Sequence, residues 1–196
     1  MKTLKDFENR LKAFNEEFAE FKKSYRKAPE VGEIIEIAGM KWKVLDKLEE
    51  GYFCITEGFE SLLTEFDSDT NNWSSSDLRN YLGIEIVEKI ENAIGEGKLI
   101  DFKRDLLSLD GQTEYVECTD KVSLLTVDEY RKYRELLPNT YKWSWLCTPW
   151  STPCNGYKRS VTVVSPSGSV SRNSCDSLSG VRPVCIFPFS IFESEE

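Results

Sequence analysis

The segment from 143 to 186 concentrates the residues that could do chemistry, and that chemistry is non-covalent binding. Its middle is rich in Ser, Asn, Gly, Tyr and Arg and poor in Leu, Ile and Phe. Tyr and Trp offer a large contact area at little entropic cost, Arg makes directional hydrogen bonds, and small polar residues adapt to a partner. Each residue could instead be an ordinary loop residue. We expect ligand contacts from Trp150, Asn155, Tyr157, Lys158, Arg159, Arg172, Asn173, Asp176 and Ser177.

Catalysis is less well supported by the composition. The chain has no His, which removes the commonest general base and the usual zinc, copper and iron ligand sets. Its 34 acidic residues are spread along the chain, so a chance pair of carboxylates carries little information. The six Cys show no C-x-x-C spacing, and we expect free thiols, although an even number permits disulfides. We therefore expect no catalytic residue, no metal and no cofactor.

Charge and hydropathy restrict the partners. A net charge of −9 disfavours binding to a phosphate backbone, so we expect no nucleic acid. No run of 18 apolar residues is present, and the first ten residues are charged throughout. We expect no signal peptide, no membrane insertion and synthesis in the cytoplasm.

One N-terminal helix is the clearest element that the pattern predicts. Its apolar residues alternate steps of three and four along residues 4–25, and Pro29 favours an end near Ala28. The stripe either packs against its own domain or forms a coiled coil that makes a homo-oligomer or docks to an assembly. The stripe consists of Leu4, Phe7, Leu11, Phe14, Phe18, Phe21 and Tyr25.

A second domain is expected over residues 31–192, followed by a solvated acidic tail at 193–196. Alternating apolar residues predict strands, beginning with an antiparallel meander, at 33–37, 41–45, 52–56, 119–125, 160–164, 168–171 and 181–187. Helical spacing predicts helices at 77–82, 84–94 and 127–137. Ser74 or Ser75 is expected to cap the first of these and Thr126 the last. Trp73 is expected to anchor the core, and Cys54 to be buried.

Short motifs in a fixed order resemble a domain family of gut bacteria and their phages. They are Val31-Gly32-Glu33, Gly39, Trp42-Lys43-Val44-Leu45, Asn72-Trp73, Ser76-Asp77-Leu78-Arg79-Asn80-Tyr81-Leu82, Thr119-Asp120-Lys121-Val122-Ser123-Leu124-Leu125-Thr126, Trp145-Leu146, Gly168-Ser169-Val170 and Gly180-Val181-Arg182-Pro183. The family looks like a branch of the C-type-lectin fold, and similar sequences are the variable proteins of diversity-generating retroelements.

The resemblance implies an α+β, C-type-lectin-like domain with short mixed or antiparallel strands and two or three helices. It also implies a variable surface within 143–186 that binds a protein or glycan ligand on a cell surface, in a phage particle or on a bacterium. The scaffold would include Trp145, Leu146 and the segment 180–183. We expect Arg182 to be a buried ion pair or hydrogen-bond hub rather than a ligand contact, and Gly180 to adopt a positive φ.

The chain departs from this family at two positions, where Cys147 replaces an Arg and Trp150 replaces a Gly.

Two other functions remain open. One is an assembly protein that acts through the N-terminal helix. The other is an enzyme like the formylglycine-generating relatives, which use a cysteine pair with copper; its thiols would come from Cys147, Cys154, Cys175 or Cys185.

Overall fold

The computed structural model describes residues 4–24, 28–58 and 63–192, and these form an α+β structure. Within these described ranges, the strands pair in three antiparallel sheets of five, two and three strands. This arrangement confirms the predicted α+β class. The expected acidic tail lies outside the described residues.

The five-stranded sheet has the order β1-β2-β3-β10-β6. Its members are β1 (Ile34–Ile37), β2 (Met40–Lys47), β3 (Gly51–Thr56), β6 (Val122–Ser123) and β10 (Val184–Pro188). The predicted meander is confirmed, because β1 pairs with β2 and β2 with β3. The prediction that the last strand begins at Val181 was wrong. Pro183 has no N–H to donate to a ladder, and the strand begins only after it.

Residues 77–94 form one uninterrupted helical segment rather than the two helices that we predicted. α2 (Asp77–Tyr81) passes through a π-helical turn, η2 (Leu82–Ile86), into α3 (Val87–Ile94). The wider turn keeps apolar side chains on the buried side, since Leu82, Ile86 and Ile90 are all buried.

Ser76 caps this helical segment, and the prediction of Ser74 or Ser75 was wrong. The Ser76 side chain accepts a hydrogen bond from the Arg79 N–H. Ser74 and Ser75 instead belong to the 3-10 turn η1 (Trp73–Ser75), which Asn72 caps. The capping residue is therefore set by this extra turn.

The predicted strand at 119–125 is divided between two sheets. β5 (Cys118–Asp120) pairs with β4 (Phe102–Arg104), whereas β6 joins the large sheet. The helix that follows is α4 (Val127–Lys132), and a 3-10 turn, η3 (Arg134–Leu136), continues it. The predicted Thr126 cap is confirmed, because Thr126 and Glu129 form a reciprocal capping box.

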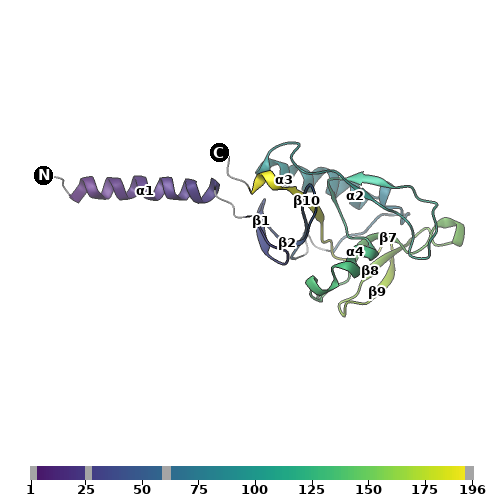
Figure 1. Cartoon of the computed structure of the whole chain (residues 1–196). Helices are drawn as coiled ribbons and strands as arrows, with labels where there is room; N and C mark the ends of the chain where they lie inside the picture. Colours follow the sequence, from purple (N-terminus) through teal and green to yellow (C-terminus); the bar gives the residue numbers. More distant parts are fainter. Residues whose placement is uncertain (1–3, 25–27, 59–62, 193–196) are drawn as a thin grey trace.

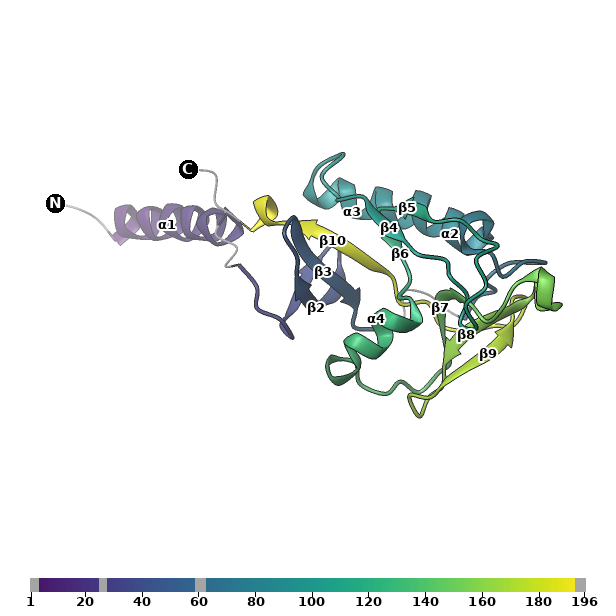
Figure 2. The ribbon, with the colours of Figure 1, turned by 45° about the vertical axis from the view of Figure 1, so that its right-hand side comes forward.

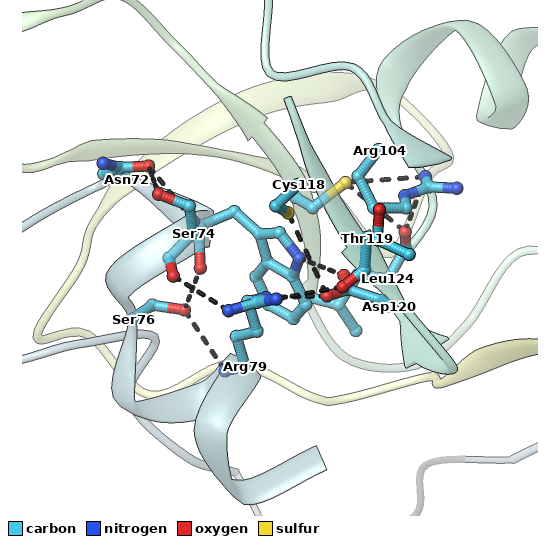
Figure 3. Close-up of polar contacts among 11 residues, drawn as sticks. Asn72, Ser74, Ser76, Arg79, Arg104, Cys118, Thr119, Asp120 and Leu124 are labelled. Atoms are coloured by element: carbon cyan, nitrogen blue, oxygen red, sulfur yellow. Dashed lines mark hydrogen bonds and ion pairs between the residues drawn. The ribbon is translucent and has the colours of Figure 1, made fainter. Parts of the chain in front are cut away.

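A buried polar hub joins three of the sequence motifs (Figure 3). The Asp120 carboxylate accepts a hydrogen bond from Trp73 Nε1 and another from Arg79 Nε, each at 2.7 Å. Trp73 is fully buried, which confirms it as a core anchor. Phe66 packs against both Trp73 and Trp145, with ring centroids 5.7 Å apart in each pair. The hub is thereby linked to the third sheet.

The third sheet, with the order β7-β8-β9, carries the candidate site. It consists of β7 (Ser144–Pro149), β8 (Ser160–Val164) and β9 (Val170–Ser174). β8 has the predicted bounds, whereas β9 begins at Val170 rather than Gly168. Gly168 has a φ of +85°, so it belongs to the turn and not to the strand. Figure 2 shows β9 at the outer edge of the sheet.

The N-terminal helix α1 (Leu4–Ser24) projects away from the rest of the molecule (Figures 1 and 2). Leu4, Phe7 and Leu11 are 76%, 64% and 50% exposed, so these three do not pack on the body, and Phe14 is 60% exposed. The side chains of Phe18 and Phe21, and Tyr25 as a whole, lie outside the described residues, as does the stretch before the predicted end at Ala28. In the described part of the chain, no helix is long and apolar enough to cross a membrane.

Candidate ligand-binding face

The nine predicted contact residues come from the β7–β8 loop, from β9 and from the turn after it. Six of their side chains form two groups of three, and the other three side chains belong to neither group. One group is the aromatic–arginine stack, which consists of Trp150, Tyr157 and Arg172. The other is the ion-pair cluster, in which Asp69 joins Lys158 to Arg159, and Arg159 also pairs with Asp176.

In the aromatic–arginine stack, the Arg172 guanidinium lies near two aromatic rings. Its central carbon is 5.5 Å from the Trp150 ring centroid and 4.9 Å from that of Tyr157. Arg172 and Tyr157 are exposed, and Trp150 is half-buried. A cation near an aromatic face gains about 0.5–1 kcal/mol at an exposed site. The two contacts therefore favour one position of this charged group on the surface.

The ion-pair cluster neutralises the other two cations of the face. Lys158 Nζ lies 2.6 Å from Asp69 Oδ2, and Arg159 bridges Asp69 at 3.2 Å and Asp176 at 2.5 Å. The hydrogen bond from Lys158 lowers the pKa of Asp69, with Arg159 adding to the effect. The pKa of Asp176 is lowered chiefly by hydrogen bonding to Ser174, and also by Arg159. These exposed pairs orient side chains but contribute little stability.

The remaining three predicted contacts make hydrogen bonds within the fold. Asn155 Nδ2 donates to Asp110 at 3.1 Å, and Asn173 Nδ2 donates to the Ser179 hydroxyl at 3.2 Å. The Ser177 N–H donates to the Ser174 carbonyl in the turn after β9. The structure therefore places these residues in the same region, where they shape the loops.

A residue that the sequence reasoning missed anchors the β7–β8 loop. Asn71 is fully buried, and its Nδ2 lies 2.8, 2.9 and 2.7 Å from the carbonyl oxygens of Ser151, Tyr157 and Ser160. Its Oδ1 accepts a hydrogen bond from Tyr115 Oη at 2.7 Å. The only sequence signal was an unusually polar, Gly-free stretch at 67–76, which gave no indication of its distant partners.

Cys147 occupies the position where the resemblance led us to expect Arg. Its Sγ accepts a hydrogen bond from Arg104 Nη2 at 3.6 Å, and Arg104 also pairs with Glu129. Burial raises the pKa of the Cys147 thiol to about 12, with the nearby Arg104 opposing the shift. An arginine thus lies beside this position, although it comes from β4.

The cysteines proposed for a copper site have different surroundings. Cys185 lies opposite Cys54 in the large sheet, whereas Cys154 is exposed and contacts Gln112. Cys175 is buried, and its N–H donates to the Arg159 carbonyl. Across the described residues, no cluster of three or more His, Cys, Asp or Glu side chains could hold a metal ion.

The expected scaffold residues are buried, which agrees with their predicted role. Trp145, Leu146 and Val181 are at most 3% exposed. Arg182 is a buried hydrogen-bond hub, as predicted, because its Nε and Nη2 both donate to the Thr56 carbonyl. Burial lowers its pKa. The prediction of a positive φ at Gly180 was wrong, because this residue instead forms a parallel bridge with Ser144 at the start of β7.

Comparisons with protein-family models, with curated proteins and with solved structures give no match to this chain. The resemblance to retroelement variable proteins therefore stays a prediction.

Proposed function

We propose that this protein is a ligand-binding module that contacts its partner through the β7–β8 loop and β9. The observation that carries the proposal is the aromatic–arginine stack. Trp, Tyr and Arg are the residues most enriched at energetic centres of interfaces, and here one of each is brought together on an exposed strand and its neighbouring loop.

Rigid support beneath the stack favours binding over a chance surface arrangement. The loop is tied to the buried Asn71, and β8 lies between β7 and β9 with Val161, Thr162 and Val163 fully buried. A preorganised surface loses less entropy when a partner binds.

We further propose that the body is a variant of the C-type-lectin-like fold and that its ligand lies on a cell surface. The predicted location of the protein, in a phage particle or on a bacterium, follows from the resemblance alone.

The test is a binding screen of the full chain on arrays of immobilised glycans and of peptides. A variant with Trp150→Ala, Tyr157→Ala and Arg172→Ala should lose binding and stay folded, with its free energy of unfolding lowered by no more than about 3 kcal/mol, because Tyr157 and Arg172 are exposed and Trp150 is half-buried. A matched control, Lys103→Ala with Glu117→Ala, removes an exposed ion pair between β4 and the residue before β5, and it should bind as the wild type does. Equal binding by the triple variant and the wild type would contradict the proposal.

A second candidate function is assembly through α1. The observation behind it is the exposed apolar stripe of Leu4, Phe7, Leu11 and Phe14, which follows a heptad spacing. We infer that α1 joins copies of the chain, so that several candidate faces are displayed together and gain avidity. Deleting residues 1–28 should leave a folded body with fewer copies per particle in light scattering. A variant with Phe7→Glu and Phe14→Glu should behave in the same way, and an unchanged number of copies per particle in both would refute assembly through α1.

A further inference from the structure

Arg172 differs from the other two cations of the candidate face in its electrostatic surroundings. Lys158 and Arg159 are paired with Asp69 and Asp176. Among the described residues, Arg172 has no carboxylate within ion-pair distance, and its hydrogen bond to the Ser160 hydroxyl is long, at 3.5 Å. Arg172 therefore contributes a positive charge that no carboxylate among the described residues pairs with.

Most of the N–H donors of this guanidinium are available, because Arg172 is exposed and, among the described residues, its one hydrogen bond is the long one to Ser160. A guanidinium carries five N–H donors in its plane, and a carboxylate binds in that plane through two parallel hydrogen bonds. A free arginine side chain samples many rotamers, and part of this rotamer entropy is lost when the side chain is held in one position. Because Trp150 and Tyr157 already restrict Arg172, less of that loss falls on the binding step.

The backbone of β9 favours a polypeptide as the source of the carboxylate. In the part of the chain that the structure describes, β9 pairs with β8 on one side and has no strand on the other. An extended peptide can add to such an edge through main-chain hydrogen bonds. A residue opposite Arg172 in the added strand would have its Cβ about 4.5–5.5 Å away, within reach of an ion pair. A glycan lacks this regular row of donors and acceptors.

We propose that the candidate face binds an extended, acidic segment of a partner protein, with an Asp or Glu carboxylate on Arg172 and the segment's backbone along β9. This inference rests on the proposed function, because it uses the same surface, and it adds the chemical class of the ligand. It also assigns a specificity-determining role to Arg172, which selects an acidic residue at one position.

The test is an array of 15-residue peptides of diverse sequence, each synthesised twice. One version carries Asp and Glu, and its twin carries Asn and Gln at those positions. The full-length wild-type protein should bind a subset of the acidic peptides at least ten times more tightly than their amide twins. Arg172→Gln should lose this preference, and Arg172→Lys should retain part of it, because an ammonium keeps the charge but not the paired geometry. Arg131→Gln, which removes another exposed arginine, should bind as the wild type does.

Several results would overturn the inference. Equal binding of acidic peptides and their amide twins would do so, as would undiminished selectivity in Arg172→Gln or an absence of peptide binding by the wild type. A parallel glycan array separates this failure from failure of the proposed function. Glycan binding that disappears in the triple variant, without binding to acidic peptides, overturns the carboxylate inference and leaves the proposed function standing. Binding that survives in the triple variant overturns both.

Discussion

Replacing Asn71 by Ala should loosen the β7–β8 loop and destabilise the body. The substitution removes a buried amide that contacts three loop carbonyls and accepts a hydrogen bond from Tyr115. The amide nitrogen has two N–H donors to share among the carbonyls, and the amide oxygen accepts one hydrogen bond, so at about 1 kcal/mol for each of these three hydrogen bonds the cost is roughly 3 kcal/mol. With a urea m-value of about 2 kcal/mol/M, the unfolding midpoint should fall by about 1.5 M.

Local exchange data separate loop anchoring from a general loss of stability. In Asn71→Ala, hydrogen exchange at the amides of residues 155–160 should accelerate more than exchange in the large sheet. Tyr115→Phe removes one donor and should cost about 1 kcal/mol. Asn80→Ala is the matched control, because Asn80 is exposed on α2, and it should change the free energy of unfolding by less than about 0.5 kcal/mol. If Asn71→Ala matches Asn80→Ala in stability and loop exchange, the assigned anchoring role is wrong.

Three further predictions concern the surroundings of the face. Gly168→Ala should destabilise the protein by about 2 kcal/mol in urea unfolding, because Gly168 has a positive φ. Gly83 has open space around it, so Gly83→Ala should raise the free energy of unfolding by up to about 1 kcal/mol, and equal effects of the two substitutions would contradict the turn geometry. Iodoacetamide on the native protein at pH 8 should modify the exposed Cys154 roughly 100 times faster than the buried thiols, and peptide mass spectrometry that found equal rates would argue against the packing. Because the pKa of Asp69 is lowered in the folded protein, the stabilisation from its ion pairs should be complete above pH 3.8, the ordinary pKa of an Asp, and should be lost as the pH falls through the lower pKa of the folded state. A side-chain NMR titration of Asp69 with a midpoint at or above pH 3.8 would refute the pairing with Lys158.

Local signals explain which elements the sequence predicted correctly. The meander of β1, β2 and β3 follows from alternating apolar residues and short turns, and the Thr126 cap of α4 follows from a capping box within four residues. Errors occurred where a distant partner decides the local structure. The predicted strand at 119–125 is split next to Asp120, whose side chain is bound by Trp73 and Arg79.

The candidate face was predicted in composition but not in arrangement. The choice of Trp150, Tyr157 and Arg172 followed from residue type, yet no periodicity links Arg172 to the two rings, because strand pairing between β8 and β9 brings them together. Asn155 and Asn173 looked equally suited to ligand contact, but they make hydrogen bonds to Asp110 and Ser179. Residue type alone does not distinguish a polar side chain that faces a ligand from one that shapes a loop.

A substitution scan of the surface-displayed full chain would show whether the β7–β8 loop and β9 form a binding surface on a fixed frame. Each variant would be measured twice, once for resistance to protease and once for binding to the ligand recovered from the arrays. We expect substitutions at Trp150, Tyr157 and Arg172 to keep protease resistance and lose binding, whereas substitutions at Trp73 and Asp120 lose both. Loss of resistance at the three stack positions, or binding that survives their replacement, would show that the aromatic–arginine stack is not a binding surface on a fixed frame.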